Sequence, residues 1–255
     1  MSVYTITFSP TGGTKKAADR LAAAFGPEVQ EIDLTARETD YSRFSFGDGD
    51  ICVVAVPSYG GRVPAAAVSR LAQMNGTGAN AVLMAVYGNR AYEDTLSELK
   101  DVLVRAGFRC IAAVAAVAEH SVMRQFASGR PNQEDLETLG EFGRRIKEAL
   151  AQNPEGTAVE VPGNIPDQEY KGIPLKPKAG ENCVGCGQCA RQCPVGAIPA
   201  DRPSETDPEL CISCMRCIQV CPVQARTLDQ TILAGASQRL EPVCSVPKEN
   251  ELFLN

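Results

Sequence analysis

Apolar residues in the N-terminal part of the chain, residues 1–151, fall into short runs separated by amphipathic stretches. The last three of the five runs that we predict as strands contain few polar residues, which is typical of a parallel sheet that is covered on both faces. The five predicted strands are Val3–Phe8, Glu28–Leu34, Ile51–Val56, Ala79–Tyr87 and Arg109–Val117.

Between the runs, apolar residues recur at helical spacing, which predicts helices. One follows the first strand, with Ala18, Leu21 and Phe25 on its apolar face, and the others cover residues 63–74, 93–106 and 133–151. Alternating strands and helices predict an α/β fold with a doubly wound, five-stranded parallel sheet, in strand order 2-1-3-4-5. The segment Thr35–Gly49 is too polar for a helix, so we expect a loop there, with one turn at most.

The first strand ends in Ser9-Pro-Thr11-Gly12-Gly13-Thr14, directly before the first helix. Free N–H groups and hydroxyls converge at such a helix start, so the loop suits an anion such as phosphate. It has neither the lysine of a P-loop nor the Gly-x-Gly-x-x-Gly of dinucleotide folds. An ordinary strand-to-helix turn is the alternative.

The loop resembles the phosphate loop of flavodoxins. The resemblance implies that Thr11, Gly12 and Thr14 bind the phosphate of FMN, and that the loops after the third and fourth strands hold the flavin ring. Tyr59 and either Tyr87 or Tyr92 are candidates to stack on the ring. We expect no catalytic residue. The expected cofactor-binding residues are Ser9, Thr11, Gly12, Gly13, Thr14, Pro57, Ser58, Tyr59, Gly60, Gly61, Tyr87, Gly88, Asn89, Arg90 and Tyr92.

Three charged or titratable residues near these loops have two interpretations each. His120, the single histidine, follows the fifth strand, so it could hold or protonate a group near the flavin, or simply bond to loop backbone. Arg62 and Arg90 could neutralise the phosphate or the reduced ring, or could be solvated surface residues.

Eight of the eleven cysteines form two copies of one motif, Cys-x-x-Cys-x-x-Cys-x-x-x-Cys-Pro, offset by 28 residues. This is the spacing of bacterial two-cluster iron–sulfur proteins, in which the fourth cysteine of each copy serves the other cluster. Zinc sites and disulfides are the alternatives, but zinc ribbons use paired Cys-x-x-Cys units, and nothing marks the chain as exported. We therefore assign one [4Fe-4S] cluster to Cys183, Cys186, Cys189 and Cys221, and a second to Cys193, Cys211, Cys214 and Cys217.

The chain has 255 residues and a formal net charge of −6, and the clusters would add negative charge. We expect no nucleic-acid partner, because binding of nucleic acid needs a basic face. A basic patch on another redox protein, as electron donor or acceptor, is the natural complement. Residues Met1–Phe8 have no signal-peptide pattern, and we see no membrane span, so we expect a cytoplasmic protein of an anaerobic or microaerobic organism.

The composition divides the chain into four parts. By the resemblance to flavodoxins, we expect residues 1–151 to form a flavodoxin-like FMN-binding domain, and the proline-containing segment 152–178 to be an extended linker. Residues 179–228 form a small α+β ferredoxin domain that depends on its clusters for stability. The tail, residues 229–255, is apolar enough to dock back on the N-terminal domain.

The whole chain resembles flavodoxin–ferredoxin fusion proteins, which implies a role in electron transfer. Iron–sulfur clusters transfer single electrons, whereas FMN can hold one or two. The first hypothesis is an electron carrier that exchanges with other redox proteins. The second is an FMN-dependent reductase of a small molecule, fed by the clusters. The third is a ferredoxin on a flavodoxin-like scaffold that binds no FMN.

Overall fold

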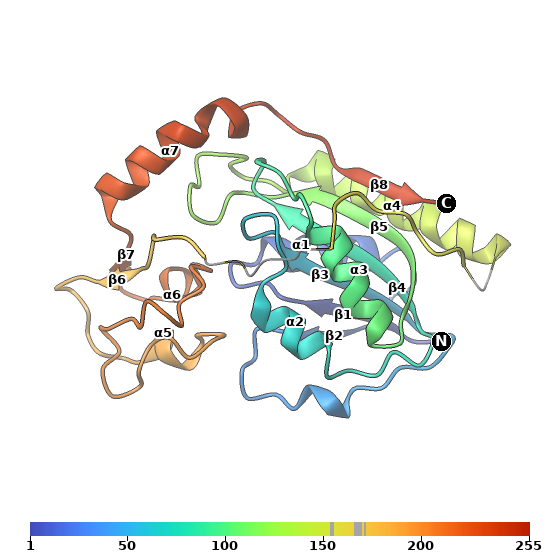
Figure 1. Cartoon of the computed structure of the whole chain (residues 1–255), viewed down its shortest axis with the longest axis horizontal. Helices are drawn as coiled ribbons and strands as arrows, with labels where there is room; N and C mark the ends of the chain where they lie inside the picture. The colour runs from blue at the N-terminus through green and yellow to red at the C-terminus, as the bar shows by residue number, and fades with distance from the viewer. Residues whose placement is uncertain (154–155, 166–169, 171) are drawn as a thin grey trace.

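The fold was obtained as a computed structural model, which describes residues 1–153, 156–165, 170 and 172–255. Its centre is a six-stranded sheet in the order β2-β1-β3-β4-β5-β8 (Figure 1). The first five strands are parallel, and β8 is antiparallel to β5. The strands are β1 (Val3–Thr7), β2 (Val29–Asp33), β3 (Ile51–Pro57), β4 (Asn80–Tyr87), β5 (Arg109–Val117) and β8 (Glu251–Leu254).

Two pairs of helices cover the two faces of this sheet. The helices α1 (Gly13–Ala22) and α4 (Gln133–Gln152) pack on one face, around Leu21, Leu139 and Ile146. The helices α2 (Ala65–Leu71) and α3 (Thr95–Arg105) cover the other face. Every residue of β4 is buried, as expected for a strand between two helical layers.

The predicted α/β class and strand order are confirmed. The order 2-1-3-4-5 is the flavodoxin-like variant of the doubly wound sheet, which binds its ligand at the carboxyl ends of the strands beside the β1/β3 switch point. Segment 35–49 contains only the 3₁₀ turn η1 (Tyr41–Arg43), as expected for its polar sequence. The sixth strand was not expected, and it comes from the tail.

The tail crosses from the cysteine-rich part back to the sheet (Figure 1). Its helix α7 (Gln230–Cys244) is followed by β8, which pairs with β5 in the register Ala113 to Phe253. Asn89 donates from Nδ2 to the carbonyl oxygens of Cys244 (2.6 Å) and Val246 (2.8 Å). The far end of α7 is thus tied to the loop after β4.

The cysteine-rich part has little regular structure. Its two-stranded sheet pairs β6 (Lys178–Ala179) with β7 (Arg226–Thr227), and its one-turn helices are α5 (Gln188–Arg191) and α6 (Arg216–Gln219). Four cysteines of the motifs belong to its buried core or pack against it: Cys189, Cys193, Cys211 and Cys217. Since sulfur atoms make up much of this core, cluster binding would supply much of its stability.

The predicted linker is described only in part, because Pro154, Glu155, Pro166–Glu169 and Lys171 lie outside the described residues. Within it, Val159 is buried and donates its N–H to the carbonyl oxygen of Cys110 at 3.0 Å, so this stretch is laid along β5. None of the helices in the described ranges is both long and apolar enough to cross a lipid bilayer.

Candidate functional site

The loop between β1 and α1 presents free backbone donors at the switch point of the sheet. Gly12 has φ of 95°, which glycine adopts without strain, and Ser9 Oγ accepts from the N–H of Lys15 at 2.9 Å. The N–H groups of Gly13 and Thr14 make no hydrogen bond to any described residue. A phosphate oxygen could accept from both of them, as well as from the hydroxyls of Thr11 and Thr14.

The loop after β3 is held in place by an ion pair. Gly60 and Gly61 have φ of 61° and 81°, and the N–H groups of Tyr59 and Arg62 each donate to the other residue's carbonyl oxygen. Arg62 Nη2 lies 2.7 Å from Glu98 Oε1, and Glu98 Oε2 also accepts from the N–H of Val63 at 2.8 Å. Arg62 therefore stabilises the loop through its ion pair with Glu98. This role differs from both of the roles expected from the sequence.

The residues of the loop after β4 have two roles: some line a cavity, and others anchor the tail. Tyr87 is buried against Tyr92, edge to face, with ring centroids 5.2 Å apart. Burial raises the pKa of Tyr87 to about 12. The hydroxyl of Tyr92 lies 3.3 Å from the carboxylate of Glu251 in β8, and Asn89 holds the tail. Tyr92 and Asn89 thus anchor the tail, whereas Tyr87 and Arg90 line a cavity.

This cavity, which we call the main cavity because most of the expected cofactor residues line it, has a volume of about 380 Å³. It lies between the carboxyl ends of the strands and the cysteine-rich part. Ten of the fifteen expected cofactor residues line it: Thr11, Gly13, Thr14, Pro57, Ser58, Tyr59, Gly60, Tyr87, Gly88 and Arg90. The other five do not: Ser9, Gly12, Gly61, Asn89 and Tyr92. Gly12 lines a neighbouring cavity, which shares Thr11 and Gly13 with this one and is also lined by Lys16 and Met215.

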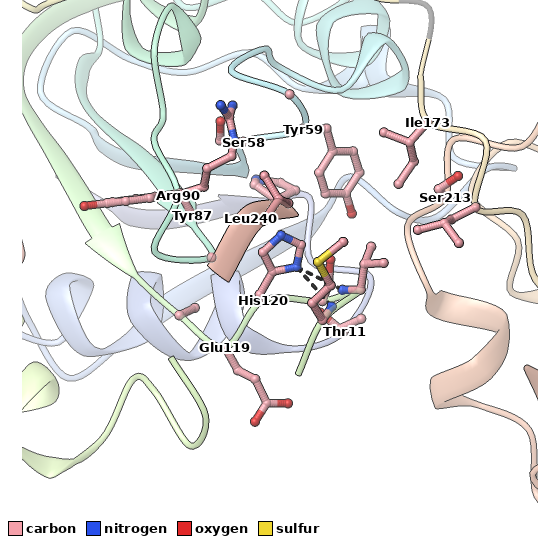
Figure 2. A pocket seen from close by; sticks show the side chains of 18 of the residues that line it. Thr11, Ser58, Tyr59, Tyr87, Arg90, Glu119, His120, Ile173, Ser213 and Leu240 are labelled. Carbon is pink, nitrogen blue, oxygen red and sulfur yellow. Dashed lines mark hydrogen bonds between the residues drawn. The ribbon is translucent and has the colours of Figure 1, made fainter. Parts of the chain in front are cut away.

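The rest of the cavity wall comes from parts of the chain that the motifs did not indicate. Figure 2 shows Ile173 and Ser213 on the side of the cysteine-rich part, facing Tyr59. The helix α7 contributes Ala236, Arg239 and Leu240. The apolar residues of the tail were a weak signal for this contact, because they predicted docking but not its place.

His120 combines both of its expected interpretations. Its Nδ1 accepts from the N–H groups of Val122 and Met123, both at 3.2 Å, so the neutral ring carries its proton on Nε2. The ring also lines the cavity (Figure 2), and Nε2 has no hydrogen-bond partner among the described residues. Burial, and then the charge of Arg90, lower the pKa of His120. A Cβ on Gly88 would lie 2.7 Å from His120, so only glycine allows this packing.

The eight motif cysteines surround two small cavities, four around each. One cavity is lined by Cys183, Cys186, Cys189 and Cys221, and the other by Cys193, Cys211, Cys214 and Cys217. The two groups are those that the crossed-over spacing predicted. Among the described residues, no three His, Cys, Asp or Glu side chains form a site for a single metal ion. In a four-iron cluster each thiolate binds a different iron, so the sulfurs need not converge on one point.

Backbone donors reach the fourth cysteine of each motif. The N–H of Ala197 donates to Cys193 Sγ at 3.3 Å, and the N–H of Ala225 donates to Cys221 Sγ at 3.2 Å. Burial raises the pKa of the free Cys214 and Cys217 thiols to about 12. Metal binding at these cysteines would therefore release protons.

The cysteine-rich part is joined to the sheet domain beside the main cavity. Arg216, in α6, donates from Nη1 to the carbonyl oxygen of Pro10 in the loop after β1, at 3.1 Å. Arg70, in α2, donates to the carbonyl oxygens of Leu34 and Pro194. Burial raises the pKa of Tyr59, and Ile212 lines both the main cavity and the small cavity of Cys214. The main cavity and the Cys214 cavity are thus neighbours.

Comparison with known proteins gives one family match. Residues 182–225 match the family of the 4Fe-4S dicluster domain. No curated protein matches the chain. Among solved structures, the flavodoxin of Streptococcus pneumoniae TIGR4 is similar over 58% of this chain and 99% of its own, with 22% identity and a TM-score of 0.43.

Two further solved structures are similar over the same part of the chain. A flavodoxin from the domain Archaea matches 59% of this chain and 99% of its own, with 13% identity and a TM-score of 0.44. Rubredoxin oxygen:oxidoreductase from Desulfovibrio gigas matches 59% of this chain and 36% of its own, with 18% identity and a TM-score of 0.43. By its strand order and its family match, the chain combines a flavodoxin-like sheet with a 4Fe-4S domain.

Proposed function

We propose that this protein is an electron-transfer protein that holds FMN in the main cavity and two [4Fe-4S] clusters at the eight motif cysteines, and that exchanges electrons with other redox proteins. FMN supplies a centre that accepts one or two electrons, and the clusters supply one-electron centres. The fit of the residues supports both groups. Free N–H groups lie at the phosphate loop, and four thiols surround each small cavity.

One observation carries the proposal. Ile212 and Ser213, which lie between the cluster cysteines Cys211 and Cys214, line the same cavity as the phosphate loop and Tyr59. A ligand in this cavity would therefore contact the loop that binds a cluster. Arg216 stabilises this arrangement, because it joins α6, the helix that contains Cys217, to the phosphate loop.

The chain's own residues have three tasks in this function. The phosphate loop would bind and orient the cofactor, while Ile173 and Leu240 of α7 would contribute apolar side chains to the cavity wall. His120 presents an Nε2–H donor to the cavity, which could bond to a ring nitrogen or oxygen of the flavin. The N–H groups of Ala197 and Ala225 donate to the cysteine sulfurs and stabilise their thiolate form.

Anaerobic reconstitution with iron, sulfide and FMN tests the proposal. We expect about eight iron atoms and one FMN per chain. Electrons delivered by a separate reduced ferredoxin should then decrease the visible absorbance of both the clusters and the flavin. Cys214→Ser should slow the reduction of the flavin. A protein that binds iron but leaves FMN in free solution would refute the FMN site and favour the scaffold hypothesis.

A second candidate function is reduction of a small molecule. It is favoured by His120, because a neutral histidine with an unpartnered Nε2–H in a largely apolar cavity can donate a hydrogen bond to a bound substrate. The discriminating measurement is the access of small oxidants to the reduced flavin. A carrier should pass electrons to a protein acceptor faster than to quinones or nitro compounds, and a reductase should show saturation with one of them.

A further inference from the structure

Arg226 is a buried cation without an acidic partner. Its side chain is 2% exposed, and its donors reach only uncharged acceptors. Nη1 donates to Thr206 Oγ1 at 2.8 Å, and Nη2 donates to the carbonyl oxygens of Pro203 and Glu205. No carboxylate in the described part of the chain forms an ion pair with it. Burial of an uncompensated charge is costly, so a negative group is needed nearby.

The Nε–H of Arg226 indicates where this negative group would lie. Arg226 Nε is buried and has no hydrogen-bond partner. The side chain lines the small cavity of Cys183, Cys186, Cys189 and Cys221, and no other cationic side chain lines it in the described part of the chain. A buried donor is costly to leave unpaired, so an acceptor in this cavity would satisfy it.

The second cysteine cavity has a matching feature. Arg216 lines the cavity of Cys193, Cys211, Cys214 and Cys217, and its Nε is also buried and without a partner. Its Nη atoms donate to the carbonyl oxygen of Pro10 and to Gln192 Oε1. Two of the four buried unpartnered side-chain atoms found among the described residues are therefore arginine Nε atoms, one at each cysteine cavity.

Resting on the proposed function, we propose that Arg226 and Arg216 each donate a hydrogen bond from Nε to a sulfur of the adjacent [4Fe-4S] cluster, and that their charges raise the cluster's reduction potential. Each cluster with four thiolates is an anion, and reduction adds one negative charge to it. A nearby buried cation stabilises the reduced form more than the oxidised form. Arg226 should have a larger effect on its cluster than Arg216 has on the other, because Arg226 is buried and Arg216 is only partly buried.

The test compares three variants in the full chain with its clusters reconstituted. Arg226→Gln removes the charge, Arg226→Lys keeps the charge but loses the Nε–H, and Arg202→Gln removes an exposed arginine of the same domain that is paired with Glu205. Iron and sulfide content establishes that both clusters are present before any potential is compared. EPR-monitored redox titration then gives the potential of each cluster.

We expect Arg226→Gln to weaken the electron affinity of the cluster at Cys183, Cys186, Cys189 and Cys221 at least tenfold, which is 59 mV for a one-electron couple, and to have a smaller effect on the other cluster. Arg226→Lys should produce a smaller shift in the same direction, and Arg202→Gln none. If Arg226→Gln retains both clusters and neither affinity changes by more than twofold, the proposal is wrong.

A measurement on the wild-type protein covers the case in which Arg226→Gln does not fold. Protein labelled with ¹⁵N at arginine Nε should show a ¹⁵N hyperfine coupling at each reduced cluster. In Arg216→Lys the coupling at the cluster beside Arg216 should be lost, and the coupling that comes from Arg226 should remain. Reduced clusters without any ¹⁵N coupling would overturn the proposal. A preparation that contains no iron would instead refute the proposed function.

Discussion

Thr14 offers the sharpest test of the FMN site, because its hydroxyl can be removed with little change in shape. Thr14 is 5% exposed and follows Gly13 in the first turn of α1, where the backbone N–H groups are unpaired. In Thr14→Val a methyl group replaces the hydroxyl, so the packing is kept and one donor to the phosphate is lost. A hydrogen bond to a charged group contributes about 1.5–3 kcal/mol.

This loss of energy converts into a loss of affinity. Since 1.4 kcal/mol corresponds to a factor of ten, we expect the Kd for FMN to rise roughly 10- to 150-fold in Thr14→Val. The assay is anaerobic titration of FMN with flavin-free protein, followed by quenching of the flavin fluorescence. Thr5→Val is the matched control, because Thr5 is 1% exposed in β1 and does not line the cavity.

The control separates packing from binding. Both variants exchange a buried threonine for valine, so both should show similar changes in the free energy of unfolding, whereas only Thr14→Val should bind FMN more weakly. A Kd within threefold of the wild-type value in Thr14→Val would refute a phosphate site at this loop. An equal loss of affinity in Thr5→Val would show that packing is responsible.

Three further predictions concern the clusters, the tail and the histidine. Cys221→Ser and Cys193→Ser should each lose about half of the bound iron, and each should abolish a different cluster signal in EPR, because the two cysteines line different cavities. Loss of the same signal in both variants would contradict the crossed-over assignment. Asn89→Ala removes two of the hydrogen bonds that hold the tail, worth about 1–3 kcal/mol, so amide hydrogen exchange in α7 should become faster. Unchanged exchange would refute this anchoring role. His120 has a lowered pKa in the folded state, so the unfolded chain binds its proton more readily, and stability should fall as the pH drops below about 6.5. His120→Gln should lose this part of the pH dependence in urea unfolding between pH 5 and 8, and an identical pH profile would contradict it.

The centre of the sheet could be predicted from the sequence because β3, β4 and β5 are almost wholly apolar. Residues such as Val53, Val54 and Leu83 are fully buried, and a parallel strand between two helical layers leaves no position for polar alternation. The cysteine groups were also predictable, since motif spacing fixes which thiols can share a cluster.

The tail and the far wall of the cavity could not be predicted in the same way. The helix α7 contains Pro242 and exposes Ile232 and Val243, so its apolar residues do not mark one clear face. Ser213 and Leu240 meet Tyr59 across the cavity only because the tail and the cluster domain fold back on the sheet. Local patterns carry no information on such contacts between distant segments.

The roles of individual loop residues could not be predicted from the sequence either. Asn89 has the sequence context of a flavin-loop residue, yet its amide holds the carbonyl oxygens of Cys244 and Val246. Arg62 has the context of a phosphate-binding arginine, yet Glu98 of α3 pairs with it. In both cases the deciding partner lies more than thirty positions away along the chain.

The central claim is that a flavin and two iron–sulfur clusters share this chain, with the flavin beside the loop of Cys211 and Cys214. An anaerobic redox titration followed together by visible absorbance and EPR tests it most directly, because it counts the centres and orders their potentials. We predict one flavin, two [4Fe-4S] signals, and broadening of one cluster signal when the flavin is partly reduced. Zinc in place of iron, or a protein without flavin bands after reconstitution with FMN, would contradict the account.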